Sequence, residues 1–202
     1  MKREIIITKD GSTSIYLPEL QEGYHSKNGA IQEALHVFIN NGLRLFEAQN
    51  EVCILEIGFG TGLNAFITFL ESNTNQQKIN YVGVEAYPIA IHEALQMNYT
   101  SQLRVENFNP VFEIIHTANW NEKIQISDAF TLTKREQLFQ DIRDKNAYDL
   151  IYFDALKPNG VLVTYACRTS IKRAMLSVGF SVEKLPGAPG KREMLRAVKN
   201  QQ

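Results

Sequence analysis

The chain has 202 residues, of which 44% are hydrophobic, enough to bury a sizeable core in one domain. Its formal net charge of -1 gives no indication of a polyanionic partner, although it leaves room for local basic patches. No apolar run reaches the length of a bilayer-spanning helix. Cys53 and Cys167 form no C-x-x-C motif, which argues against zinc and disulfides. We therefore expect a cytoplasmic protein without metal or membrane contact.

The N-terminal region predicts a β-hairpin followed by a helix. Two apolar stretches, 5–7 and 14–17, flank a turn in which Asp10-Gly11 supplies the positive backbone angles of a two-residue turn. We expect this hairpin to add to the main sheet. Residues 1–45 would then form an N-terminal addition to a cofactor-binding core over residues 46–202.

Residues 51–64 contain an apolar strand, a glycine-rich turn and the start of a helix. The strand has the near-continuous apolar pattern of one buried on both faces. Gly58, Gly60 and Gly62 can adopt backbone angles closed to other residues, and they let a ligand approach the main chain beside the free N–H groups of the helix. A dinucleotide fingerprint would place its third glycine at position 63, which is Leu63.

Three later strands are each expected to end in an acid. Residues 79–85 end in Glu85, at the distance from the glycines where an acid accepts hydrogen bonds from both ribose hydroxyls. The alternative for Glu85 is a favourable position near the N-terminus of the next helix. Asp128 and Asp154 end the strands predicted at 123–130 and 148–154. Because ligands bind outside the carboxyl ends of parallel strands, we expect these acids to meet at one crevice.

The remaining chain gives three further expectations. Residues 133–136 form a Thr-Lys-Arg-Glu capping box, which predicts that a helix begins there. The strands 148–154 and 160–165 are too close in sequence for a parallel crossover, which needs about a dozen residues. They form an antiparallel hairpin, or a segment of roughly twenty residues is absent between Ala155 and Leu156. Residues 180–185 and 194–198 are expected to complete the sheet.

The pattern E-x-G-x-G-x-G, which begins at Glu56, resembles the first motif of the class I S-adenosylmethionine-dependent methyltransferases. Several strings together resemble one family of that class: the methyltransferase domain of the bifunctional tRNA-modification enzyme MnmC and its stand-alone relatives. The glycine string with its trailing Leu-Asn and the late Lys-Arg-Glu-Met are fairly specific together. The strings span most of the chain, and they are Tyr24-His25-Ser26, residues 56–64, Phe153-Asp154-Ala155 and Gly190-Lys191-Arg192-Glu193-Met194.

The resemblance implies an α/β, Rossmann-like class I methyltransferase fold in a single domain over residues 1–202. Its sheet would be mostly parallel and seven-stranded, with helices on both faces and the N-terminal hairpin as an addition. In such folds an acid at the position of Asp128 commonly accepts the adenine amino group, although Asp128 could merely cap a turn. The cofactor would be S-adenosylmethionine, bound by Glu56, Gly58, Phe59, Gly60, Gly62, Asn64, Glu85 and Asp128.

The resemblance also implies N-methylation of the 5-aminomethyl group on the wobble uridine of certain tRNAs. Asp154 would be the catalytic residue, orienting the amine and receiving its proton, with Tyr24 and Phe59 as pocket walls. Lys191 and Arg192 would contact phosphate, or they form a solvated surface. Alignment of donor and acceptor can supply on the order of 7–11 kcal/mol of the barrier, so no strong base is required.

Two departures from the family pattern bear on this expectation. The family's Phe-Ala-Pro-like loop and helix after the strand that ends in Asp154 are missing. No flavin-dependent oxidase domain follows before Gln202, so we expect methylation without the preceding decarboxymethylating step. The alternatives are a methyltransferase or aminopropyl transferase for another small amine, a nicotinamide oxidoreductase, which Leu63 disfavours, and a non-catalytic binding module.

Overall fold

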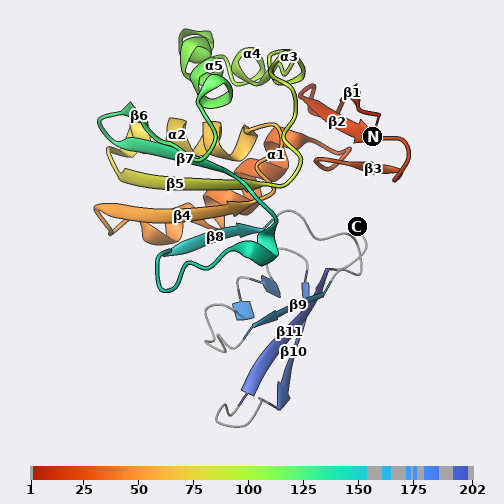
Figure 1. Ribbon diagram of the computed structural model, residues 1–202, viewed down its shortest axis with the longest axis vertical. Coiled ribbons are helices and arrows are strands. Elements are labelled where there is room, and N and C mark those ends of the chain that lie inside the picture. The colour runs from red at the N-terminus through yellow and green to blue at the C-terminus, as the bar shows by residue number, and fades with distance from the viewer. Residues whose placement is uncertain are drawn as a thin grey trace. The chain divides into compact units, whose positions relative to one another are not determined.

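The computed structural model describes residues 2–153, 161–164, 172–173, 175–176, 180–186 and 193–199. The chain separates into two compact units, residues 1–152 and 153–202. Figure 1 labels their helices and strands. Within the described residues, no helix is both long and apolar enough to cross a membrane.

The N-terminal strands form a small antiparallel sheet of their own. Its order is β1 (Glu4–Ile7), β2 (Thr13–Leu17) and β3 (Glu22–Gly23), which confirms the predicted hairpin. The expected two-residue turn is wrong, because the Thr8 N–H donates to the Ser12 carbonyl at 2.8 Å across a three-residue loop. Within that loop only Gly11 has a positive φ, 84°, as in hairpins whose third loop residue is left-handed.

The central sheet has the order β6-β7-β5-β4-β8. β4 is parallel to β5, β5 is parallel to β7, and β6 is antiparallel to β7. The arrow of β8 points the same way as those of β4, β5 and β7 in Figure 1. The mostly parallel α/β fold is therefore confirmed, and among the described residues this sheet has five strands, where seven were expected. Their bounds are Glu51–Ile57 (β4), Lys78–Glu85 (β5), Lys123–Ser127 (β6), Phe130–Glu136 (β7) and Leu150–Phe153 (β8).

The second unit contains a separate antiparallel sheet of order β10-β11-β9. Its strands are β9 (Val161–Thr164), β10 (Phe180–Pro186) and β11 (Glu193–Lys199). The last two strands were predicted correctly, but they pair in this sheet and not with the central one. The connection 154–160, with the segment expected to be absent between Ala155 and Leu156, lies outside the described residues.

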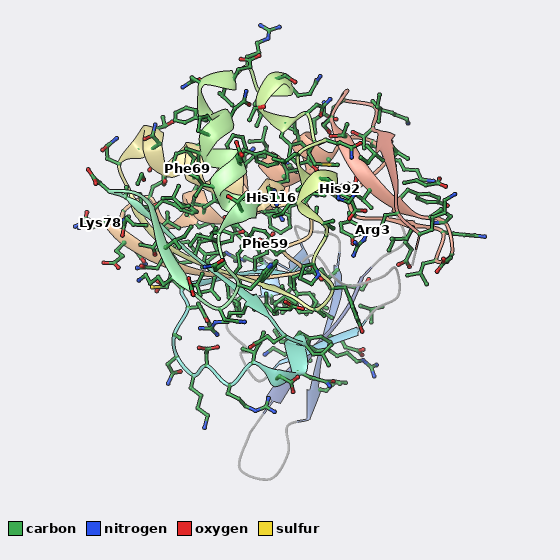
Figure 2. The ribbon with its side chains drawn as sticks, turned by 45° about the horizontal axis from the view of Figure 1, so that its top comes forward. Arg3, Phe59, Phe69, Lys78, His92 and His116 are labelled. Atoms are coloured by element: carbon green, nitrogen blue, oxygen red, sulfur yellow. The ribbon has the colours of Figure 1, made fainter. Side chains whose placement is uncertain are left out.

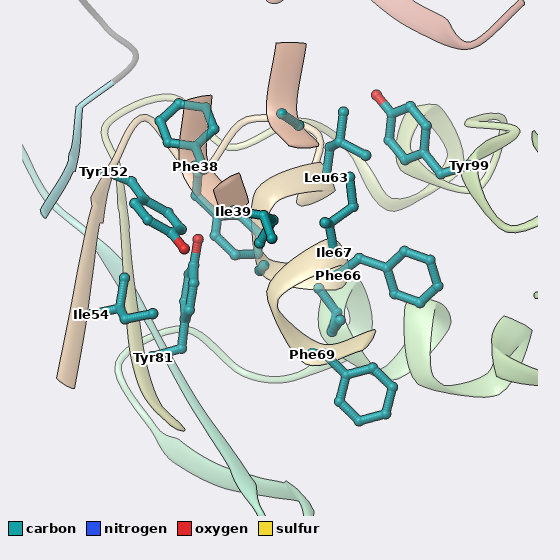
Figure 3. Packing of buried hydrophobic residues seen from close by; sticks show 14 of the residues in the cluster. Phe38, Ile39, Ile54, Leu63, Phe66, Ile67, Phe69, Tyr81, Tyr99 and Tyr152 are labelled. Carbon is teal, nitrogen blue, oxygen red and sulfur yellow. The ribbon is translucent and has the colours of Figure 1, made fainter. Parts of the chain in front are cut away.

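Helices cover the face of the central sheet that carries Tyr81, Phe130 and Tyr152, which are at most 1% exposed. The ring centroids of Phe38 and Tyr152 are 4.9 Å apart, and those of Phe69 and Phe130 are 5.7 Å apart. Figure 3 shows this largely aromatic core between the strands and α2. The helical elements are α1 (Ala30–Ala34), η1 (Leu35–Asn40), η2 (Leu43–Phe46), α2 (Leu63–Asn75), α3 (Ile91–Ala94), α4 (Tyr99–Gln102), η3 (Glu106–Phe108), α5 (Asn109–Thr117) and η4 (Phe139–Asp141).

The predicted helix at the capping box of residues 133–136 is wrong. These residues end β7, which forms a hairpin with β6, and only the short turn η4 follows. Phe130, Leu132 and Lys134 alternate along the inward face of β7, each at most 1% exposed. Because a lysine is rarely buried, the alternation of buried and exposed residues in this strand is not recognisable from the sequence.

Candidate active site

The glycine-rich loop joins β4 to α2 in a conformation that requires glycine. Gly58, Gly60 and Gly62 have φ values of 90°, 48° and 68°, in the left-handed region that disfavours residues with a Cβ. The N–H groups of residues 58 and 59 both donate to the Val84 carbonyl, at 2.9 and 3.1 Å. The loop is thus fixed beside the end of β5.

The N-terminal segment packs directly on this loop. A Cβ built on Gly60 would lie 3.1 Å from Cδ2 of Tyr24, so the tyrosine ring contacts the main chain there. Burial raises the pKa of the Tyr24 hydroxyl above its usual value. The Tyr99 hydroxyl donates to Thr61 Oγ1 of the loop at 2.9 Å.

Glu85 stands at the end of β5 with its carboxylate oriented by the backbone. Oε2 accepts the Gly60 N–H at 3.0 Å, and Oε1 accepts the Tyr87 N–H at 2.9 Å. An ionised carboxylate has about four acceptor positions, so each oxygen can accept another hydrogen bond. These free acceptor positions suit the two hydroxyls of a ribose, which is the role predicted for Glu85.

Glu56 and Asn64, both expected to bind the cofactor, lie in the protein interior. Glu56 is 1% exposed, and its carboxylate accepts bonds from Asn64 Nδ2 and from the Tyr81 hydroxyl, both at 2.9 Å. Glu56 thereby connects β4 to α2 and β5. Asn64 Oδ1 is buried and has no hydrogen-bond partner among the described residues. Direct contact of either residue with a cofactor stays a prediction.

The expected position of Asp128 is wrong. Phe130, two residues further on, pairs with Ile79 at the beginning of β5, whereas Glu85 pairs with Glu136 at its end. At about 3.3 Å per residue, the two ends of this pairing lie roughly 20 Å apart. Asp128 is therefore at the edge of the sheet opposite the glycine loop. The acid at the end of β7 is the exposed Glu136, which sequence reasoning missed because β7 was not recognised as a strand.

The other predicted site residues cannot be placed. Asp154, Lys191 and Arg192 lie outside the described residues, and their roles stay predictions. β8 ends at Phe153 and lies next to β4 in the sheet. In the part of the chain that is described, no group of three or more histidine, cysteine or acidic side chains is suited to hold a metal ion.

A cavity of about 230 Å³ adjoins the glycine loop on the helix-covered side of the sheet. The ring of Phe59 is 3% exposed, with its centroid 6.2 Å from that of His116 and 6.0 Å from that of Trp120. Phe59 and His116 are labelled close together in Figure 2. Apart from Phe59 and Gly60, sequence reasoning assigned a role to none of its wall residues, which are Phe59, Gly60, Ile89, Ile91, His116, Thr117, Ala118, Asn119, Trp120 and Lys134.

Two basic side chains at this cavity have pKa values altered by burial. Burial, and secondarily the charge of Lys134, lowers the pKa of His116 to about 4. Burial lowers the pKa of Lys134 to about 8. At neutral pH the imidazole is therefore uncharged, and most of the ammonium is protonated.

These features define a class of protein. A mostly parallel sheet has a glycine-rich loop after one strand and a backbone-oriented acid at the end of the next, which is the nucleoside-binding arrangement of class I methyltransferases. A family model described as S-adenosyl-L-methionine-dependent methyltransferase matches residues 75–200. The chain belongs to this family, and its cofactor is S-adenosylmethionine.

Known relatives support the resemblance to MnmC. The chain is 26% identical to the tRNA 5-methylaminomethyl-2-thiouridine biosynthesis bifunctional protein MnmC of Leptospira borgpetersenii, over 85% of this chain and 31% of that protein. It is 25% identical to the protein of the same name from Polaromonas naphthalenivorans, over 97% of this chain and 36% of that protein. The chain thus spans about a third of these relatives. The crystal structure of MNMC2 from Aquifex aeolicus matches all of this chain and 73% of that chain, with a TM-score of 0.59 and 18% identity, which shows the fold.

The described residues fit S-adenosylmethionine. Glu85 has acceptor capacity for the ribose hydroxyls, and it is hydrogen-bonded to the glycine loop at Gly60. The buried Asn64 Oδ1 is an acceptor without a partner at the start of α2. This cofactor supplies a methyl group on a sulfonium, and the chain supplies position.

Proposed function

We propose that this chain methylates the primary amine of 5-aminomethyl(-2-thio)uridine at the wobble position of tRNA, giving 5-methylaminomethyl(-2-thio)uridine. The proposal is supported by membership of the methyltransferase family together with relatives whose name refers to tRNA 5-methylaminomethyl-2-thiouridine biosynthesis. The structural observation that carries it is the Glu85 carboxylate, held by Gly60 and Tyr87 beside the glycine loop. Its partner would be tRNA, and it would act in the cytoplasm.

The chemistry demands a neutral amine, because an ammonium has no lone pair to attack a methyl group. With a lysine-like pKa of about 10.4, deprotonation at pH 7 costs roughly 4–5 kcal/mol. A water-poor wall next to the amine lowers this cost, and Tyr24 contributes such a wall at Gly60. Asp154, which follows β8, would orient the amine and receive its proton as the new bond forms.

The test uses tRNA that lacks the final methyl group. The protein is incubated with this tRNA and S-adenosylmethionine carrying a labelled methyl group, and the tRNA is then digested to nucleosides. Label in 5-methylaminomethyluridine, and in no other nucleoside, is the expected result. Unlabelled tRNA from a protein that binds S-adenosylhomocysteine normally would reject tRNA as the substrate.

A small cationic amine is the second candidate acceptor, because the exposed Glu136 ends β7 beside Glu85, the residue predicted to hold the ribose. A carboxylate at that position attracts a polyamine more readily than it attracts a polyanion. Putrescine and spermidine are therefore offered in parallel, each with S-adenosylmethionine and with its decarboxylated form. Methyl or aminopropyl transfer to these amines, without transfer to tRNA, would establish the second candidate.

A further inference from the structure

Lys134 is a buried cation with no acidic partner among the described residues. Its side chain comes from the inward face of β7 and the residue is 1% exposed. Nζ donates to the His116 carbonyl at 2.7 Å and lies 4.8 Å from the centre of the Trp120 ring. A neutral carbonyl and an aromatic face compensate only part of the cost of removing an ammonium from water.

The ammonium lines the cavity beside the glycine loop. His116 also lines it and is 8% exposed, but its Nε2 atom faces the loop backbone, at the Thr61 N–H and 2.9 Å from the position of a Cβ on Gly62. The apolar wall residues include Ile89, Ile91 and Phe59. The cavity therefore combines apolar walls with one positive charge.

We propose that this cavity binds a carboxylate, with Lys134 Nζ as its charge partner. A single negative charge matches the single ammonium, and a charge-assisted hydrogen bond would satisfy its remaining donors. A phosphate dianion fits less well, because residues 116–118 form the C-terminal end of α5, where the helix dipole disfavours additional negative charge. The apolar walls would contact the carbon atoms of the same ligand.

The carboxylate has two possible sources. Phe59 and Gly60 belong both to the glycine loop and to the cavity wall, so the amino-acid tail of the methyl donor can supply it. A separate small carboxylate is the other source. The volume of about 230 Å³ is below the roughly 300–1,000 Å³ of drug-sized ligand pockets, so the cavity would take a small ligand or one part of a larger one. This inference does not depend on the identity of the methyl acceptor.

Calorimetric titrations test the first source. S-adenosylhomocysteine, which keeps the amino-acid tail, is compared with 5′-methylthioadenosine, which lacks it, on the wild type and on Lys134→Met and Lys78→Met. Lys78 is an exposed lysine on β5 and serves as the matched control. If the tail is the ligand, Lys134→Met weakens the binding of S-adenosylhomocysteine about 10- to 100-fold and leaves the binding of 5′-methylthioadenosine unchanged. The control Lys78→Met binds both compounds like the wild type.

Chemical labelling tests the second source in the wild type, where folding is not in question. Lys134 is reductively methylated with formaldehyde, and its labelling rate is followed by mass spectrometry with and without butyrate. Protection of Lys134 by butyrate in the presence of bound S-adenosylhomocysteine, with no protection of Lys78, would identify a separate carboxylate site. If Lys134 is labelled equally with either ligand or none, and Lys134→Met binds S-adenosylhomocysteine like the wild type, the proposal is rejected and the lysine is satisfied by water.

Discussion

The ring of Phe59 fills the space that a side chain on Gly83 would occupy. A Cβ atom at Gly83 would lie 2.2 Å from Cδ2 of Phe59, far inside van der Waals contact. Gly83 pairs with Glu56 on one side and Lys134 on the other, so it lies in the middle of the sheet. The absence of a side chain there lets the glycine loop anchor its aromatic residue on the sheet.

Gly83→Ala should therefore displace the Phe59 ring and with it the glycine loop. Overpacking of this kind costs about 1–3 kcal/mol of unfolding free energy. Because Phe59 lies between Gly58 and Gly60, its displacement should also weaken S-adenosylhomocysteine binding. Urea unfolding and calorimetry measure the two effects. The double variant Gly83→Ala/Phe59→Leu should recover part of both, and a single variant that behaves like the wild type would show that the ring moves freely.

Glu85→Gln should weaken the binding of S-adenosylhomocysteine about 10- to 100-fold, because the charged carboxylate that accepts two hydroxyls is replaced by an amide with one acceptor oxygen. The amide nitrogen would also face the N–H of Gly60 or Tyr87. Asp128→Asn is the control, since Asp128 lies at the opposite edge of the sheet. The dissociation constant of this variant for S-adenosylhomocysteine should stay within about twofold of the wild-type value. Equal losses in both variants would contradict the assignment of Glu85.

The sequence was most informative where side-chain type and local geometry agree. The strand at 51–57, its three glycines and the acid at Glu85 follow a pattern in which the turn needs positive φ and the strand is apolar on both faces. These features predict that the glycine loop and Glu85 lie next to each other, as the structure shows, without any knowledge of the rest of the sheet. The same holds for the N-terminal hairpin, whose Gly11 marks the turn although the loop length was misjudged.

The sequence misled where tertiary burial overrides residue type. Lys134 occupies an inward strand position, so β7 looked like the start of a capped helix and Asp128 looked like a strand end. Glu56 bonds to Asn64 and Tyr81 inside the core, a role that the sequence did not indicate, and its contact with the cofactor stays a prediction. Neither burial is encoded in a local pattern, because each depends on partners distant in the chain. The division of the described strands into three sheets likewise has no local signal.

Tyr81→Phe should lower the unfolding free energy by about 1–3 kcal/mol, because it leaves one oxygen of the buried Glu56 carboxylate without its donor. Tyr152→Phe is the matched control. Its hydroxyl is also buried, but it is 3.4 Å from Thr68 Oγ1, so the loss should be smaller. Urea unfolding compares the two. If Glu56 instead contacts the cofactor, Tyr81→Phe would change S-adenosylhomocysteine affinity more than stability.

His25 should make the protein less stable as the pH falls below neutrality. Burial lowers its pKa from 6.5 to about 4, and Nδ1 lies 2.8 Å from Ser14 Oγ. Between pH 6.5 and 4 the unfolded chain binds a proton that the folded chain does not, so unfolding free energy decreases across this window, by up to about 3 kcal/mol. Urea unfolding at pH 7, 6 and 5 should show a shallower decrease in His25→Asn, which retains a polar group near Ser14. The exposed His36→Gln should retain the wild-type slope.

Lys134→Met should leave the protein as stable as the wild type at pH 7 or more stable. Burial holds the pKa of this lysine near 8 against 10.5 in the unfolded chain, a shift worth up to about 3 kcal/mol that the variant recovers. Against this, the His116 carbonyl loses its donor, at a cost of about 1–3 kcal/mol.

The net change expected is a gain between zero and about 2 kcal/mol at pH 7. The same shift has a second consequence, because between pH 8 and 10.5 the unfolded wild type binds more protons than the folded protein. Wild-type stability should therefore rise with pH in that window, and the advantage of the variant should shrink. Urea unfolding at pH 7, 8.5 and 10 measures both effects. A variant that loses more than about 3 kcal/mol at pH 7 would show that the ammonium stabilises the fold, and the carboxylate proposed to compensate it would no longer be needed.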